Sequence, residues 1–173
     1  MRILKYGNPI LRKKAEVIEK FDSSLSLLAE EMVKTMQNNA GIGLAANQIG
    51  EPIRMFVAKL NEKIYTAINP QVLPLSGTII AEEGCLSIPE VWLDIERYEK
   101  VKLKAQDLKG KMFELELEGV DARVVQHELD HLNGILIIDR IPVEKRKEID
   151  VKLKMIAKEE ENIQKFSLKE GKL

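Results

Sequence analysis

Two histidines and a glutamate stand at a spacing that can bind a metal ion and activate water. The segment VVQHELDHLNG (124–134) holds His127 and His131, the only histidines of the chain, and Glu128 follows the first. Residues four apart on a helix lie about 6 Å apart on one side, so two imidazoles can converge on one ion. A glutamate one position round can take a proton from a water bound there. The alternative is a helix with two ordinary histidines and a solvent-facing carboxylate.

A catalytic metal site of this kind needs a third protein ligand and leaves one position for water. The chain has no third histidine to serve as that ligand. Metzincin proteases have a histidine at the position that Ile137 occupies here. A glutamate of the last helix is one candidate, as in thermolysin-like zinc peptidases. The single cysteine, Cys85, is the other, although a lone cysteine is commonly an inert, buried side chain.

The histidines belong to a segment with helical periodicity. Gly119 precedes this segment and Gly134 stands where a C-terminal cap glycine is expected, so we predict a helix between them. Its apolar face is formed by Ala122, Val125, Leu129 and Leu132. A second helix is predicted from Asp22, a suitable cap, to Asn39.

Strands are predicted to fill the middle of the chain. Segments 53–60 and 63–70 indicate two strands joined by a tight turn at Asn61–Glu62. Alternation over 92–118 predicts a hairpin that turns at DLKG (107–110). These elements predict an α+β fold with antiparallel strands around the central histidine helix.

A charged, amphipathic helix is predicted at the end of the chain, over about 142–165, followed by a frayed tail. Its buried stripe is expected to contain Ile149, Leu153, Ile156 and Ile163. We find no repeat or linker, and we therefore expect one domain over residues 1–173.

Composition excludes several classes of function. The chain has 173 residues, 45% apolar and 32% charged, with a formal net charge of -1. This balance gives no electrostatic basis for binding nucleic acid or an anionic membrane. No apolar run reaches the length of a membrane span, and MRILKYGNPILRKKA (1–15) lacks the features of a secretory signal. With one cysteine as well, we expect a cytoplasmic protein.

Three motifs together resemble the peptide deformylase family. They are GIGLAANQIG (41–50), EEGCLSIP (82–89) and QHELDHLNG (126–134), in the order that the family has them. The opening ILKYGNPILRKKAEVI also looks like a deformylase N-terminus, and the similarity runs from about residue 2 to residue 145. The resemblance implies the deformylase fold and the hydrolytic removal of the formyl group from N-terminal formylmethionine of new proteins, releasing formate.

The resemblance also implies roles for particular residues. Cys85, His127 and His131 would hold one divalent metal ion, and a water at the fourth position would attack the formyl carbon. Glu128 would act as general base and then as general acid. The Gln48 side-chain amide and the Leu86 backbone N–H would stabilise the oxyanion.

Further residues are predicted around these groups. The methionine pocket and substrate channel would be lined by Ile42, Gly43, Gly84, Val120, Arg123 and Val124. Gly84 would let the backbone turn closely around the site. Arg123 departs from the apolar residue that the family often has, so only its aliphatic stem would line the pocket. Glu83 and Gln126 would fix the orientation of an imidazole or of the backbone beside the ligands, and Asp130 would do the same for a histidine or face solvent.

The ligand set does not select one metal. The resemblance favours Fe²⁺, and Zn²⁺, Ni²⁺ or Co²⁺ suit the same side chains. The expected partners are N-formylmethionyl nascent polypeptides, with a transient ribosome contact as a candidate role for the last helix and a solvated surface helix as the default. The alternatives are a zinc peptidase of the HExxH type, in which Cys85 is a bystander, and a non-catalytic metal- or peptide-binding module.

Overall fold

The chain begins with an irregular segment that leads into the first helix. The computed structural model describes residues 1–169. A short 3-10 turn at Pro9–Arg12 precedes α1 (Ser23–Asn38). The Asp22 carboxylate caps α1 by accepting hydrogen bonds from the backbone N–H groups of Ser24 and Leu25. The predicted first helix is confirmed.

Five strands form one antiparallel sheet in chain order. They are β1 (Gly43–Ala45), β2 (Met55–Leu60), β3 (Lys63–Cys85), β4 (Ile88–Gln106) and β5 (Met112–Glu118). The turn between β2 and β3 is confirmed, with left-handed φ angles of 47° at Asn61 and 63° at Glu62. The hairpin of β4 and β5 is confirmed as well.

One strand is much longer than predicted. The sequence pattern ends β3 at Pro70, but the strand continues to Cys85 and pairs with β4 along this length. The pairing shifts register between Ile68 and Gln71 and again after Pro74. These bulges accommodate prolines that would otherwise end a strand, because a bulged residue needs no ladder hydrogen bond. The long β3–β4 hairpin brings Cys85 back from the middle of the chain to the histidine helix.

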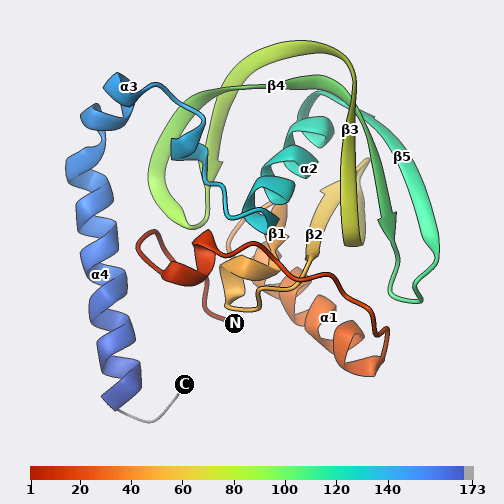
Figure 1. The fold of residues 1–173 in the computed structure, drawn as a ribbon, viewed down its shortest axis with the longest axis horizontal. Coiled ribbons are helices and arrows are strands. Elements are labelled where there is room, and N and C mark those ends of the chain that lie inside the picture. Colours follow the sequence, from red (N-terminus) through yellow and green to blue (C-terminus); the bar gives the residue numbers. More distant parts are fainter. Residues whose placement is uncertain (170–173) are drawn as a thin grey trace.

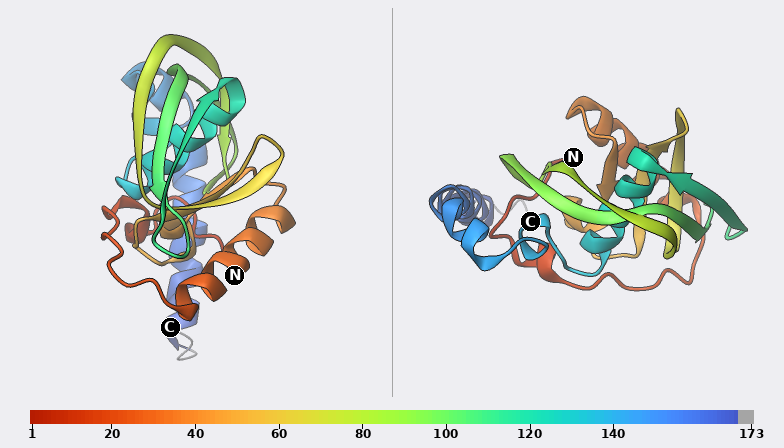
Figure 2. Two further views of the ribbon diagram at one scale, coloured as in Figure 1. Left: turned by 90° about the vertical axis from the view of Figure 1, so that its right-hand side faces the viewer. Right: turned by 90° about the horizontal axis from the view of Figure 1, so that it is seen from above.

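The sheet curves around the predicted histidine helix, α2 (Gly119–Leu132), which contacts all five strands. Figures 1 and 2 show β3 and β4 bending over it. Val125 and Leu132 of its apolar face are buried in the core cluster that the strands share. Gly134, with φ of 72°, lies so close to the Arg12 backbone that a Cβ would meet its carbonyl oxygen at 2.5 Å. On α2, His131 is buried and His127 is partly buried.

The C-terminal region differs from the single predicted helix. It forms α3 (Val143–Glu148) and α4 (Asp150–Lys169), separated at Ile149, whose ψ of 1° is not helical. Leu153 and Ile156 are buried as predicted, but Ile163 is 42% exposed because the end of α4 extends past the core cluster (Figure 1). The helix thus continues beyond residue 165, and residues 170–173 of the predicted tail lie outside the described residues.

Three clusters of apolar side chains stabilise the fold. The first lies between α2 and the strands, and the second between α1 and strands β1 and β2. The third joins α4, the 3-10 turn Ile137–Asp139 and the start of β4, and it includes Cys85. Across residues 1–169, no helix is both long enough and apolar enough to span a membrane.

Candidate active site

A cysteine and two histidines converge where the end of β3 meets α2. One donor atom each of Cys85, His127 and His131 lies within 4.8 Å of the other two. The Cys85 Sγ atom is 3.2 Å from Nε2 of His131. The two imidazole rings are 4.9 Å apart, centre to centre, in an edge-on arrangement. Residues 46 positions apart are thus brought together as the motifs predict.

The donor set fits one divalent metal ion. Nδ1 of His127 contacts Glu83 Oε2 at 3.1 Å, which leaves Nε2 as the free nitrogen of that ring. Burial alone would raise the pKa of the Cys85 thiol, but His131 and His127 beside it hold that pKa well below its ordinary value. The thiolate is the form of cysteine that binds metal. Two imidazoles and a thiolate suit Zn²⁺, Fe²⁺ and related ions.

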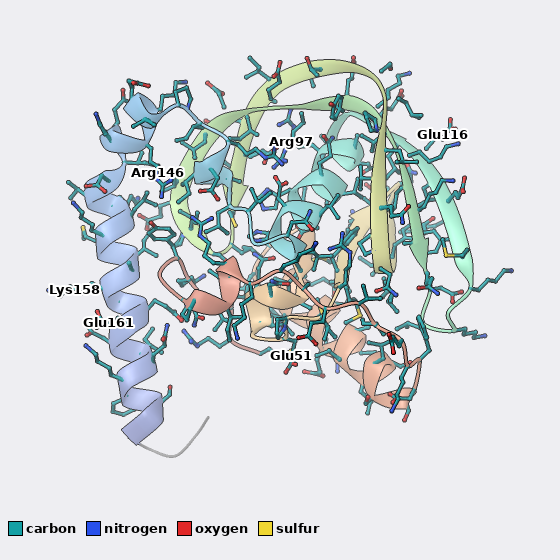
Figure 3. The ribbon with its side chains drawn as sticks, in the orientation of Figure 1. Glu51, Arg97, Glu116, Arg146, Lys158 and Glu161 are labelled. Atoms are coloured by element: carbon teal, nitrogen blue, oxygen red, sulfur yellow. The ribbon has the colours of Figure 1, made fainter. Side chains whose placement is uncertain are left out.

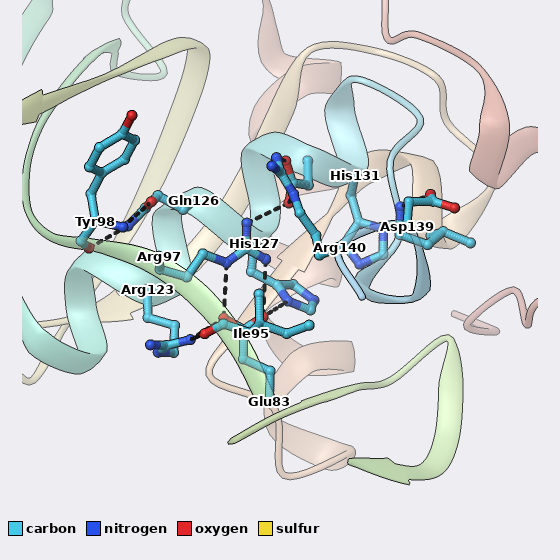
Figure 4. Close-up of polar contacts among 12 residues, drawn as sticks. Glu83, Ile95, Arg97, Tyr98, Arg123, Gln126, His127, His131, Asp139 and Arg140 are labelled. Carbon is cyan, nitrogen blue, oxygen red and sulfur yellow. Dashed lines mark hydrogen bonds and ion pairs between the residues drawn. The ribbon is translucent and has the colours of Figure 1, made fainter. Parts of the chain in front are cut away.

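A buried ionic network lies behind His127 (Figure 4). Arg97 donates to both oxygens of Glu83, at 2.9 and 3.0 Å, and Arg123 donates to the same carboxylate at 2.7 Å. Burial would raise the pKa of Glu83, but the hydrogen bonds from His127 and Arg97 lower it to about 2. Glu83 is therefore a permanent anion that holds the His127 ring in place.

The Glu128 carboxylate is buried, and one of its oxygens has no hydrogen-bond partner in the part of the chain that the structure describes. It is 3% exposed, and its Oε2 atom has no hydrogen-bond partner among the described residues. Burial raises its pKa to about 6, although the neighbouring His127 and His131 act to lower it. A carboxyl group with that pKa can accept and release a proton near neutral pH.

A glycine makes room for this carboxylate. A Cβ atom on Gly43 would lie 2.3 Å from Glu128 Oε1, closer than atoms can approach. Sequence reasoning assigns Gly43 to the substrate channel, whereas the structure places it directly against Glu128. Any larger residue at position 43 must displace the carboxylate.

The Gln48 side chain reaches the site from the 3-10 turn Ala46–Ile49. Its Oε1 atom accepts a hydrogen bond from the Ala45 backbone N–H at 2.9 Å. Its Nε2 atom donates to Ser87 Oγ at 3.2 Å and lies 3.9 Å from Cys85 Sγ. Leu86, between Cys85 and Ser87, forms the turn of the β3–β4 hairpin. Two hydrogen-bond donors, the Gln48 amide and the Leu86 N–H, thus belong to segments that border the cluster.

The predicted pocket residues divide into two groups. Ile42 and Val120 are exposed and line a hollow beside the β2–β3 turn, together with Lys59, Asn61, Glu62 and Asp121. Val124 is buried in the core between α2 and the sheet. Only the first pair is therefore open to a ligand in this structure.

Arg123 is directed toward the β3–β4 hairpin. Its guanidinium donates to the backbone carbonyls of Ile79 at 3.0 Å and Ile95 at 2.9 Å, in addition to Glu83. Figure 4 shows it beside Ile95 and Glu83. The guanidinium thus binds the Glu83 carboxylate and the backbone of the hairpin.

Gly84 makes room for an aromatic side chain. The indole of Trp92, the residue that pairs with Gly84 across the hairpin, covers it, and a Cβ there would meet that ring at 2.9 Å. Trp92 itself is 65% exposed. The glycine therefore permits an aromatic side chain to pack closely beside Cys85, a candidate metal ligand.

Gln126 and Asp130 contact groups other than the imidazoles. Gln126 exchanges hydrogen bonds with the backbone of Tyr98, at 3.0 and 2.8 Å, and so joins α2 to β4. Asp130, which is expected from the sequence to orient a histidine or face solvent, is buried and bound by Arg97 and Arg140. Both residues fix the backbone of α2 and not an imidazole.

Arg97 is the member of this network that sequence reasoning missed. It is 5% exposed and lies between the sheet and α2, whereas other charged side chains such as Lys158 and Glu116 lie on the outer elements (Figure 3). The alternation of β4 contains the signal, because Leu93, Ile95 and Arg97 share the inward face. An arginine at an inward position of a strand requires acidic partners.

Three clustered side chains of the types that bind metal, with a buried glutamate beside them, are typical of a metallohydrolase site. The polypeptide deformylase family model matches residues 1–147. A curated peptide deformylase of Thermotoga neapolitana is 48% identical over 158 residues, which cover 91% of this chain and 96% of the relative. The chain belongs to the peptide deformylase family.

Solved structures agree with this assignment. The crystal structure of peptide deformylase from Thermotoga maritima is 48% identical and superposes with a TM-score of 0.79, covering 82% of this chain and 97% of that one. The enzyme from Thermus thermophilus is 41% identical with a TM-score of 0.86, covering 91% and 98%. The expected fold is therefore confirmed.

Proposed function

We propose that this protein hydrolyses the formyl group from the N-terminal formylmethionine of newly made polypeptides and releases formate. The observation that carries the proposal is the position of Glu128. Its unpartnered oxygen lies in a buried site beside the convergent Cys85, His127 and His131 side chains. A binding module has no need of a buried carboxylate with a raised pKa, which costs stability.

The three convergent side chains would hold one divalent metal ion. When bound, the ion would supply Lewis acidity and lower the pKa of the attacking water. Glu83 would keep the His127 ring oriented, since its pKa of about 2 keeps it ionised at any physiological pH. Fe²⁺ is the ion we propose for the cell, and the donor set also suits Zn²⁺, Ni²⁺ and Co²⁺.

Glu128 would transfer the proton. Its carboxylate takes a proton from water as the water oxygen bonds to the formyl carbon. The carbon–nitrogen bond then breaks, and Glu128 returns the proton to the departing amine nitrogen. The products are formate and a polypeptide with a free amino terminus, and Glu128 ends ionised as it began.

Two donors would stabilise the negative oxygen that forms on the formyl group. These are the Gln48 side-chain amide and the Leu86 backbone N–H, which border the cluster from two segments. One such donor typically contributes about 3 kcal/mol to lowering the barrier. The hydrogen bond from Ala45 to Gln48 Oε1 directs the amide nitrogen toward the site.

Methionine binding would use the two exposed apolar side chains beside the β2–β3 turn. Ile42 and Val120 line the hollow there, and Val124 and the stem of Arg123 would support its wall from α2. Gly43 and Gly84 would border the substrate backbone through their main chains, since Glu128 and Trp92 occupy the space beside their Cα atoms. An unbranched thioether suits an apolar wall of this kind.

The remaining expectations concern the setting of the protein. We propose one catalytic domain over the whole chain and a place of action in the cytoplasm, where nascent formylated chains are made. Contact between α4 and the ribosome stays a prediction. The acidic and basic residues of α4 nearly balance, so its charge gives no specific support for such a contact.

The test is formate release from a formyl-Met peptide by the purified protein, loaded with Fe²⁺ without oxygen. The Cys85→Ala variant separates this proposal from the zinc peptidase alternative, since a peptidase would keep its metal and its activity. We expect loss of metal and of formate release together. Cleavage of internal peptide bonds, with metal retained after this substitution, would establish the alternative.

A further inference from the structure

The N-terminal segment passes between the two parts of the chain that carry the proposed oxyanion donors. The Leu4 backbone N–H donates to the Gln48 carbonyl at 2.7 Å. The Tyr6 backbone N–H donates to the Ser87 carbonyl at 2.8 Å. Residues 4–6 thus connect the Gln48 turn to the β3–β4 turn.

Lys5 adds a side-chain contact to these backbone bonds. Its ammonium donates to the Leu86 carbonyl at 2.5 Å, and the side chain is half-buried. A charged donor forms a stronger hydrogen bond than a neutral one. The Leu86 carbonyl and the Leu86 N–H belong to successive peptide units that meet at the Leu86 Cα atom. Because Leu86 lies in the tight turn between the paired residues Cys85 and Ile88, its φ and ψ angles have little freedom, and a contact that fixes the carbonyl also restricts the direction of the N–H.

Glu160 of α4 fixes the path of this segment. Its carboxylate is fully buried and accepts from both terminal nitrogens of Arg2, at 2.6 and 2.9 Å. It also accepts from the Lys5 backbone N–H at 3.3 Å and the Asn8 amide at 2.8 Å. Arg2, Lys5 and Asn8, which are spaced three apart in the sequence, therefore all donate hydrogen bonds to this one carboxylate.

We propose that Lys5 is a positioning residue, which holds the Leu86 backbone through its carbonyl so that the Leu86 N–H points at the oxyanion of the reaction, with Glu160 fixing the Lys5 backbone. The inference rests on the proposed function, because it assigns a role within that reaction. Lys5 touches neither substrate nor metal in this scheme. Its effect passes through Leu86, and a donor misdirected by a fraction of an ångström loses much of its effect in the transition state.

The test compares Lys5→Met, which keeps the stem and loses the donor, with Lys5→Arg, which keeps a charged donor. We expect Lys5→Met to lower kcat about 10-fold with KM within about twofold, because the lost interaction acts in the transition state. Lys5→Arg should recover most of the rate. Lys14→Met, at an exposed lysine of the same segment, is the matched control and should behave as wild type.

A second readout does not depend on turnover. The amide resonance of Leu86, followed by NMR in the metal-free and Zn²⁺-loaded proteins, should move in Lys5→Met and stay near its wild-type position in Lys5→Arg. If Lys5→Met does not fold, Lys5→Gln replaces it. The glutamine side chain is too short to reach the Leu86 carbonyl, so the Leu86 resonance should move in this variant too.

The outcomes separate the two proposals. A wild-type protein that releases no formate contradicts the proposed function, and the Leu86 resonance then still decides whether Lys5 orients that peptide. An active wild type with unchanged kcat and an unmoved resonance in Lys5→Met overturns the inference. A loss that appears in KM alone, or that arginine does not restore, overturns it too.

Discussion

Glu128 on α2 and Glu160 on α4 are both almost completely buried, yet their surroundings are opposite. Glu128 has an oxygen with no hydrogen-bond partner among the described residues, and burial raises its pKa to about 6. Glu160 receives hydrogen bonds from Arg2, Lys5 and Asn8. Burial would raise its pKa also, but these donors, Arg2 foremost, hold that pKa below its ordinary value.

The difference shows what a buried carboxylate is for. A fully satisfied carboxylate stays ionised and joins distant parts of the chain, as Glu160 joins α4 to the N-terminal segment. A carboxylate that lacks partners is a cost to the fold and is retained where it does chemistry. Four measurements test this contrast.

The largest effect is expected from Glu128→Ala. Removal of the general base should reduce formate release by a factor on the order of 10²–10⁴. The three metal-binding side chains remain, so metal content should stay at the wild-type level. Kinetics on the metal-loaded variant, with metal measured in the same sample, tests this. Wild-type turnover in the variant would remove Glu128 from the mechanism.

Gly43→Ala should act on the same carboxylate without removing it. The new Cβ would lie 2.3 Å from Glu128 Oε1, so the carboxylate must move. We expect turnover to fall about 10- to 100-fold, the scale of a misplacement near 1 Å. Gly77→Ala, at a glycine of β3 with φ of 59°, is the comparison, since it should lower stability without changing turnover. Unchanged kinetics in Gly43→Ala would mean that the Glu128 position is not critical.

Glu160→Ala should lower the stability of the fold rather than act on the reaction step itself. It leaves the buried Asn8 amide without its partner and ends the contact with Arg2. We expect a loss of about 2 kcal/mol in the free energy of unfolding, measured with denaturant. Glu159→Ala changes the exposed neighbour and should have little effect. Equal stability of the two variants would contradict the anchoring role.

The smallest effect is the pH dependence of that anchor. The pKa of Glu160 in the folded protein lies below its ordinary value of 4.5. Its contribution to stability is therefore complete above pH 4.5 and declines as pH falls through the lower, folded-state pKa. The difference in unfolding free energy between wild type and Glu160→Gln should be constant from about pH 7 to 5 and shrink at lower pH. If the difference in unfolding free energy instead grows as pH falls, the pKa of Glu160 is raised by folding, which contradicts this prediction.

Local spacing was enough to predict the helix of His127 and His131, its end at Gly134, and the turn at Asn61–Glu62. These features depend on neighbours along the chain. The approach of Cys85 to the histidines required the family motifs, because no local pattern pairs residues that far apart.

The ionic partners of the site were not predictable in the same way. Arg97 and Asp130 are charged residues in segments where most charges face solvent, and their partners lie on other elements. Glu160 had a better signal, since it continues the stripe of Leu153 and Ile156 at helical spacing. The prediction placed Ile163 on that stripe because apolar character was used as the only mark of burial.

The close contact between Trp92 and Gly84 also makes tryptophan fluorescence a probe of the site. Trp92 is the only tryptophan of the chain. Its indole packs against Gly84, the residue that precedes the proposed metal ligand Cys85. Its emission therefore reports from this one place. Titration with a paramagnetic ion such as Co²⁺ should quench that emission, so loading of the site can be followed without a label.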